Sequence, residues 1–328
     1  MGSLYLYVAQ KEKSSPPLTV PRDHEVLIRG KNMGFYPKAG SDVYVSRMVK
    51  GKLLYRHRNQ IDEYNRRIPR EENPRAREHV IFAGCSFIYG EGLDNKDSLP
   101  VLFQKKNPEA QSYNLGLPGG GLHTLLRYPE VFPLKEIIRP ASGYYLYFFL
   151  PQHMDRFFMR FNFLIWAHPL FAHYSIREGK LVDHGEVADT TKFFIARKAR
   201  EFGLMRAIVA LDPERYSEKE LADFAIAVRL LKERIQRDLP QTKFRFVAHP
   251  LLAFDSSNEE LLMRELRTQG VDILEVKERF EALKKERGVN IQDLSIQDDG
   301  HPTALNNELL TEVLTSAIDL SSDKARPE

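Results

Sequence analysis

The chain has 328 residues, of which 42% are hydrophobic and 28% charged, proportions typical of a globular protein that can bury a sizeable core. The 48 Lys and Arg residues against 45 Asp and Glu leave a net charge of only +3, so charge predicts neither a nucleic-acid nor a membrane partner. A single cysteine excludes an internal disulfide, and no apolar run is long enough for a membrane span. Localisation stays open. The chain is expected to be periplasmic or secreted if an N-terminal signal or anchor was trimmed, and cytoplasmic otherwise.

Residues 1–77 are expected to form an N-terminal accessory segment. Pro and Gly interrupt residues 1–40, which indicates an irregular lead-in. Residues 42–47 and 53–58 flank a turn near Lys50–Gly51, and this pattern predicts a β-hairpin. A loop rich in Arg, Glu and Pro, residues 66–77, separates this segment from a main domain over residues 78–328.

From residue 79 onward, short apolar strands alternate with amphipathic helices. Strands are predicted at 79–84, 111–116, 144–149, 243–248 and 271–276, and helices near 218–238, 258–269 and 304–319. The capping boxes Ser217-x-x-Glu220 and Ser257-x-x-Glu260 mark the starts of the first two helices. Five strands with interleaved helices predict an α/β fold, in which a parallel sheet is covered on both faces.

Residues from about 150 to 210 are unusually rich in aromatic side chains. This stretch contains Phe157, Phe158, Phe161, Phe163, Trp166, Phe171 and Tyr174. One interpretation is an inserted helical subdomain with its own small core. The other is a cap that lines an apolar acyl or ligand pocket beside Ser86, because aromatic side chains serve both purposes.

The main chemical signal follows the first strand of the main domain. Gly84–Cys85–Ser86 breaks that strand and places a serine beyond its carboxyl end, at the edge of the sheet where ligands bind in open α/β folds. Gly90 and Gly92 allow the next loop to adopt positive φ. A serine nucleophile needs an adjacent base, and Asp298–Asp299–Gly300–His301 offers a histidine with neighbouring carboxylates. Each residue alone has an ordinary structural interpretation, as a helix cap or a loop residue.

These two blocks, together with Asn114–Leu115–Gly116–Leu117–Pro118–Gly119, resemble the first, second and last blocks of the SGNH (GDSL-type) hydrolases. The resemblance spans residues 78 to 320 in the family's order. It implies a flavodoxin-like, three-layer α/β/α sandwich with five parallel strands in the order 2-1-3-4-5. It also implies a catalytic triad of Ser86, His301 and Asp298, in which Asp298 has the family's D-x-x-H spacing. Asp299 is the alternative orienting carboxylate.

The resemblance further implies an oxyanion hole made by the backbone amides of Ser86 and Gly119 and by a third donor. The family usually supplies an asparagine after the third strand. Here Gln152 stands at that position, His153 is a competing candidate, and Asn162 is a remote one.

Two departures from the family pattern bear on the site. Cys85 stands where the family usually has Asp, and the Gly-x-Asn-Asp block is not present as such. Cys85 is also a second candidate nucleophile, but it points away from the base if Ser86 faces it, because successive side chains point in different directions. Cys85 and His153 are both expected to contact the substrate.

The function that the resemblance implies is hydrolysis of a carboxylic ester, with a short acyl or acetyl group on a small molecule or a glycan. No metal or organic cofactor is expected. Two alternatives stay open: an acyltransferase that passes the same acyl group to a sugar hydroxyl, and a catalytically degenerate protein that only binds. A nucleotide-binding protein with a similar sheet is disfavoured, because the sequence has neither a P-loop nor a dinucleotide-binding fingerprint.

Overall fold

The computed structural model describes residues 18–20, 27–30, 33–49, 51–67, 73–251 and 254–320. Most of the predicted irregular lead-in therefore lies outside the described residues, as does Lys50 of the predicted hairpin turn.

Four parallel strands form the central sheet: β6 (Glu78–Gly84), β7 (Ala110–Gly116), β8 (Gly143–Phe149) and β11 (Thr242–Ala248). They lie in the order β11-β8-β6-β7, so β6 is flanked by β7 and β8. Every residue of β6, β7 and β8 is buried, as expected for a sheet with helices on both faces. Each of these four strands was predicted to within one residue at each end.

The prediction of a fifth strand at 271–276 is wrong. Ile273 makes only an isolated parallel bridge to Phe246 of β11. The two backbone hydrogen bonds of this bridge join Phe246 to Asp272 and Leu274, both at 2.9 Å. Helix α13 (Lys277–Glu286) begins three residues later, so the extended segment ends before a ladder can form. The sheet therefore has four strands, and the predicted order 2-1-3-4 holds for those four.

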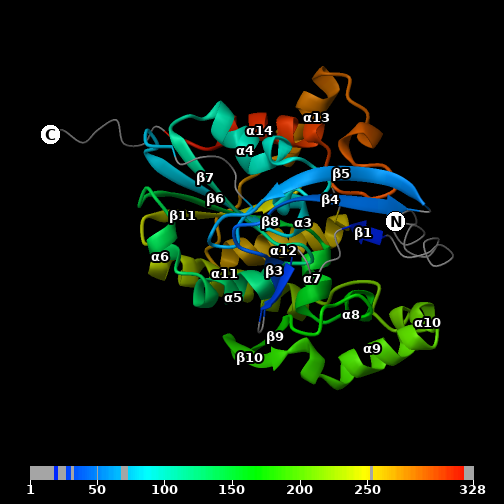
Figure 1. The fold of residues 1–328 in the computed structure, drawn as a ribbon. Helices are drawn as coiled ribbons and strands as arrows, with labels where there is room; N and C mark the ends of the chain where they lie inside the picture. The colour runs from blue at the N-terminus through cyan, green and yellow to red at the C-terminus, as the bar shows by residue number, and fades with distance from the viewer. Residues whose placement is uncertain are drawn as a thin grey trace.

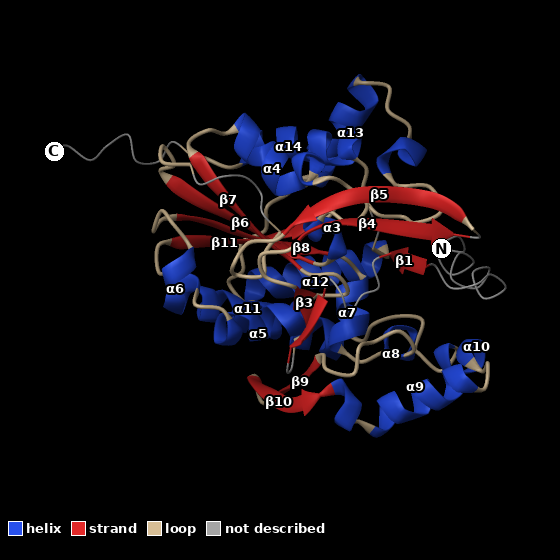
Figure 2. Ribbon diagram, viewed as in Figure 1, coloured by secondary structure: helices blue, strands red, loops and turns tan. Residues whose placement is uncertain are grey.

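Helices cover both faces of the sheet (Figures 1 and 2). One face carries α5 (Leu122–Val131), α11 (Glu218–Asp238) and α12 (Ser256–Thr268), and the other carries α4 (Leu99–Lys106), α13 and α14 (Ala304–Ala317). The predicted capping box is present at α11, where Ser217 Oγ accepts from the Glu220 amide at 3.3 Å. Helix α12 instead begins at Ser256, because the carboxylate of Asp255 accepts from the Asn258 amide. The α/β/α layers of the prediction are thus present around the smaller sheet.

The predicted hairpin forms from β4 (Asp42–Val49) and β5 (Lys52–Gln60), which pair antiparallel. Strand β1 (Leu18–Val20) pairs with β4, and β2 (Leu27–Gly30) pairs with β3 (Gly34–Pro37). Arg67 follows this hairpin and is 1% exposed. Its guanidinium donates to the carbonyls of Tyr89, Gly90 and Leu93, and thereby fastens the accessory segment to the loop that follows Ser86.

The aromatic-rich segment contains both helices and a hairpin. Its elements are α7 (Gln152–Phe157), α8 (Phe161–Leu164), β9 (Ala172–Arg177), β10 (Lys180–Glu186), α9 (Thr191–Glu201) and α10 (Met205–Val209). Leu164, Ile165, Phe171 and Phe193 belong to a small core separate from the two that flank the sheet. Among the described residues, no helix is both long enough and apolar enough to cross a membrane.

Candidate active site

Ser86 is the first residue of a short helix, α3 (Ser86–Tyr89), which begins directly after β6. Asn114 on the neighbouring strand β7 donates to the carbonyl of Ile88 at 3.1 Å and so holds this helix against the sheet. The loop after α3 turns back through Gly90 and Gly92, whose φ angles are +82° and +85°. Both glycines therefore adopt the positive φ predicted for this loop, a region that other residues rarely enter. This local geometry places Ser86 at the carboxyl edge of the sheet.

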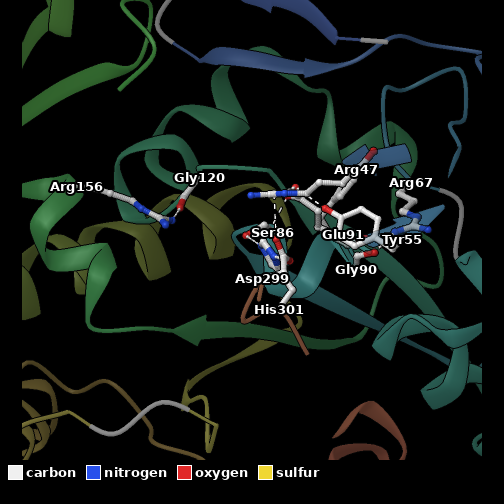
Figure 3. A network of polar contacts seen from close by, with 11 residues as sticks. Arg47, Tyr55, Arg67, Ser86, Gly90, Glu91, Gly120, Arg156, Asp299 and His301 are labelled. Atoms are coloured by element: carbon white, nitrogen blue, oxygen red, sulfur yellow. Dashed lines mark hydrogen bonds and ion pairs between the residues drawn. The ribbon is translucent and has the colours of Figure 1, made fainter. Parts of the chain in front are cut away.

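His301 approaches Ser86 from the opposite end of the domain. The two residues are 215 positions apart in sequence, and His301 Nε2 lies 2.8 Å from Ser86 Oγ. The loop that carries His301 is closed by a hydrogen bond from the Ile296 amide to the His301 carbonyl, at 2.7 Å. The structure therefore brings the predicted hydroxyl and the predicted base into hydrogen-bonding contact, as Figure 3 shows.

The carboxylate that contacts His301 is Asp299 and not Asp298. Asp299 Oδ2 is hydrogen-bonded to His301 Nδ1, and the Asp299 side chain has no exposed surface. Asp298 is exposed and has a φ of +61°. This left-handed conformation turns the chain at Asp298 and directs the next residue towards His301. The predicted contact between Asp298 and His301 is therefore wrong, and Asp299 makes this contact in its place.

The accessory hairpin reaches the same cluster, which the sequence did not predict. Arg47 on β4 places its Nη1 3.1 Å from Asp299 Oδ1 and 3.4 Å from Glu91 Oε1 (Figure 3). The hydroxyl of Tyr55, on β5, lies 3.4 Å from the same Glu91 oxygen. Glu91 Oε2 lies 3.7 Å from His301 Nε2. The only sequence signal for Glu91 is its position between two glycines after the serine, and Arg47 has none.

The charges around His301 change its pKa. Burial alone would lower the pKa of the imidazole, but the nearby carboxylates of Glu91 and Asp299 favour its protonated form. Arg47 opposes them in part, and the net effect is that the pKa of His301 is raised above its ordinary value. His301 is thus a stronger base than a free histidine.

A cavity of about 250 Å³ opens beside the glycine loop that follows β7. It is lined by Gly119, Gln152, Asp155, Arg156, Asn162, Phe163, Trp166, His168 and Phe171. Gly119 follows β7 and Gln152 follows β8, so these two residues come from the strands on either side of the one that carries Ser86. Gln152 Oε1 is buried and has no hydrogen-bond partner among the described residues. Aromatic side chains of the inserted segment therefore line a pocket, whose lining includes neither Ser86 nor His301. The same segment also has a small core of its own, so features of both interpretations are present.

Two predicted substrate contacts are wrong because the side chains are buried elsewhere. Cys85 is 1% exposed beneath the start of α3. His153 is fully buried, and its Nδ1 lies 3.0 Å from the hydroxyl of Tyr147, against whose ring it stacks. Burial and the nearby Arg156 hold the pKa of His153 well below its usual range. Neither side chain offers surface to a substrate.

The described part of the chain contains no cluster of three or more His, Cys, Asp or Glu side chains that could hold a metal ion.

No protein-family model and no curated protein matches the sequence. Several solved structures do. A GDSL-like lipase from Parabacteroides merdae matches with a TM-score of 0.42 and 12% identity, over 76% of this chain and 99% of its own. The psychrotrophic esterase EstA from Pseudoalteromonas sp. matches with a TM-score of 0.42 and 11% identity, over 73% and 96%. The acetyl xylan esterase AlAXEase matches with a TM-score of 0.41 and 12% identity, over 74% and 100%. The solved structures to which this chain is similar thus include GDSL-type lipolytic proteins and esterases.

Proposed function

We propose that this protein is a serine hydrolase of carboxylic esters, with Ser86 as nucleophile, His301 as general base and Asp299 as the residue that orients the base. One observation carries the proposal: His301 Nε2 lies 2.8 Å from Ser86 Oγ while its Nδ1 is bonded to a buried carboxylate. This is the arrangement that activates a serine hydroxyl.

The reaction follows from these contacts. Ser86 Oγ attacks the ester carbonyl carbon, and its proton passes to His301 Nε2. The tetrahedral intermediate then collapses and expels the alcohol, which takes the proton back from His301. Water attacks the resulting acyl-serine, again giving a proton to His301, and the carboxylic acid leaves as Ser86 is restored. Asp299 stabilises the imidazolium that forms in both halves of the reaction.

The oxyanion of each intermediate would be held by the backbone amides of Ser86 and Gly119 and by the side-chain amide of Gln152. The strand order supports this proposal, because Gly119 and Gln152 flank the strand that positions the serine. The buried Gln152 oxygen, which has no partner among the described residues, belongs to a side chain that lines the cavity.

The composition of the cavity favours a short acyl ester of a sugar or a similar polyhydroxylated alcohol. Phe163, Trp166 and Phe171 offer apolar faces. The two charged lining residues already have protein partners: Asp155 accepts from Tyr216 and from Asn162, and Arg156 donates to the carbonyl of Gly120. A neutral ligand with apolar faces and hydroxyl groups fits such a lining better than an ion does.

Labelling with a fluorophosphonate probe, together with hydrolysis of p-nitrophenyl acetate and of acetylated xylo-oligosaccharides, tests this function. The wild-type protein should be labelled at Ser86 and release acetate. Ser86→Ala and His301→Ala should do neither, whereas Ser257→Ala, which changes an exposed serine on α12, should behave as wild type. An unlabelled, inactive wild type would contradict this proposal and favour the alternative of a protein that only binds. Transfer of acetyl to an added sugar in preference to water would identify an acyltransferase.

A further inference from the structure

The buried carboxylate of Asp299 contacts side chains from two distant parts of the chain. Its Oδ2 faces His301, and its Oδ1 lies 3.1 Å from Nη1 of Arg47. Because the Asp299 side chain has no exposed surface, its charge has to be stabilised by protein groups and not by bulk water, and the Arg47 guanidinium is a cation in contact with it. Arg47 therefore supplies the charge that allows an ionised carboxylate to stay beside the histidine.

Arg47 also contacts both of the carboxylates, Asp299 and Glu91, that lie beside the imidazole of His301. The same Nη1 atom lies 3.4 Å from Glu91, whose other oxygen is 3.7 Å from His301 Nε2. Tyr55, on the partner strand of the hairpin, also reaches Glu91. Both strands of the accessory hairpin thus place a side chain in the cluster around His301.

We propose that Arg47 is a positioning residue of the catalytic centre: it holds Asp299, and through it His301, in line with Ser86. The N-terminal hairpin is then part of the active site and not an appendage to it. This inference rests on the proposed function.

Kinetics of Arg47→Gln, Arg47→Lys and the control Arg58→Gln test it. Arg58 lies on β5 and pairs with Asp42 at the surface, where both side chains are about half exposed, so its loss should leave the kinetics unchanged. Arg47→Gln should lower kcat on the order of 10²-fold with a smaller effect on KM, because misalignment of a catalytic group affects the chemical step. Arg47→Lys should recover much of that loss.

The pH profile separates positioning from simple stabilisation of the fold. The groups that face His301 are Asp299, Glu91, Arg47 and His57, and His57 is held neutral because burial lowers its pKa to about 3. Loss of the Arg47 cation should raise the pKa of His301. The acid limb of the pH profile, the pH range in which kcat/KM falls as His301 is protonated, should therefore move to higher pH in Arg47→Gln and return in Arg47→Lys. A purely structural arginine would lower the melting temperature and leave that limb in place.

Two results would overturn the inference: wild-type kcat in Arg47→Gln, or an acid limb that does not move. If the wild-type protein is not labelled at Ser86, the proposed function fails separately. Titration of His301 by NMR in wild type and Arg47→Gln then decides whether Arg47 acts on the Asp299–His301 pair.

A second, independent observation concerns the outer face of α9 and α10, which project from the body of the molecule (Figure 1). Six of the eleven large hydrophobic side chains that are exposed among the described residues lie in or beside these helices: Trp166, Phe194, Ile195, Phe202, Leu204 and Leu211. Phe194 on α9 is 60% exposed, and Phe202, which directly follows the last residue of α9, is 72% exposed. A cluster of this kind marks an interaction surface.

The same segment is strongly basic. Between residues 191 and 211 the sequence has five basic side chains, Lys192, Arg197, Lys198, Arg200 and Arg206, against the single acidic Glu201. Within these bounds the formal charge is +4, while Asp189 and Asp212 flank the segment and Lys198 pairs with Glu201. Two copies of the chain would bring these charges face to face, which disfavours self-association through this surface. Exposed aromatic side chains among cations suit an anionic lipid surface.

We infer that the outer face of α9 and α10 docks on an anionic membrane surface. Trp166 belongs to this face and also lines the cavity, so docking would hold the cavity beside the lipid headgroups.

Co-sedimentation of the full chain with phosphatidylcholine vesicles, with and without phosphatidylglycerol, tests this surface without any measurement of activity. Binding should require phosphatidylglycerol and weaken at high salt. Phe194→Ser/Phe202→Ser and Arg197→Glu/Lys198→Glu should each weaken it on the order of 10-fold. The control Leu53→Ser, at a 57% exposed position of the hairpin, should not. Equal binding by all variants, no binding by wild type, or a dimer that the Phe194→Ser/Phe202→Ser variant dissociates would overturn the inference.

Discussion

Asp299 and His301 lie two residues apart on one tight turn, and their side chains meet through Oδ2 and Nδ1. Asp298, one position earlier, is exposed on the same turn. The turn is closed by hydrogen bonds from the amides of Asp299 and Gly300 to the carbonyl of Ile296, at 3.1 and 2.8 Å. Adjacent carboxylates thus have different environments, and only Asp299 contacts the imidazole.

Asp299→Asn should lower kcat by about 10⁴-fold, because an amide at this position no longer fixes the histidine tautomer or stabilises its charge. Asp298→Asn is the matched control and should retain wild-type kcat. Steady-state hydrolysis of p-nitrophenyl acetate measures both. The opposite ranking of the two variants would return the orienting role to Asp298.

Glu91→Gln should move the acid limb of kcat/KM to lower pH. His301 acts as a base only when neutral, and the negative charge of Glu91 is one of the influences that raise its pKa. Removal of that negative charge lowers the pKa of His301, so the neutral base persists at more acidic pH. Glu278→Gln, at an exposed position of α13, is the control. An unchanged limb would mean that Glu91 does not act on the free enzyme's histidine.

Gln152→Ala should reduce kcat by about 10²–10³-fold with little change in KM, the loss expected for one oxyanion donor. Asn162→Ala, at another lining residue of the same cavity, should affect KM more than kcat. The separation of kcat from KM distinguishes an oxyanion donor from a general pocket residue. A Gln152 variant with wild-type kcat would exclude it as the third donor.

Stability should fall as the solution becomes acidic, partly because of His123. This ring is fully buried between Phe163 and Phe171, and neither of its nitrogens has a hydrogen-bond partner among the described residues. Burial lowers the pKa of His123 to about 3, whereas the unfolded chain titrates near the ordinary value of about 6.5. Between these values the unfolded state binds the proton and the folded state does not, so the free energy of unfolding falls with falling pH.

Urea unfolding at pH 7 and pH 5 measures this effect. His123→Leu keeps an apolar side chain in the pocket and removes the titrating group, so its midpoint should fall less between the two pH values than that of the wild type. An equal fall in both proteins would show that other groups, such as the buried His249, account for the acid sensitivity.

The sequence by itself determined the layered architecture and the two segments, around Ser86 and His301, that form the candidate active site. The four strands are short segments enriched in apolar or β-branched residues, and such local patterns can be recognised without knowledge of distant contacts. Ser86 and His301 each follow a recognisable local motif at a strand or helix boundary, so their meeting could be predicted from the order of the elements.

Only the tertiary structure decided the rest of the site. The choice between Asp298 and Asp299 depends on one backbone angle, the positive φ at Asp298, because that angle sets which side chain faces the histidine. Arg47 reaches Asp299 because the hairpin packs over the catalytic edge, a contact that spans most of the chain. Cys85 and His153 are excluded from the site by burial, and the fifth strand was lost because the chain enters α13 too soon. Each of these outcomes is set by side-chain direction and long-range packing, which the sequence pattern alone does not specify.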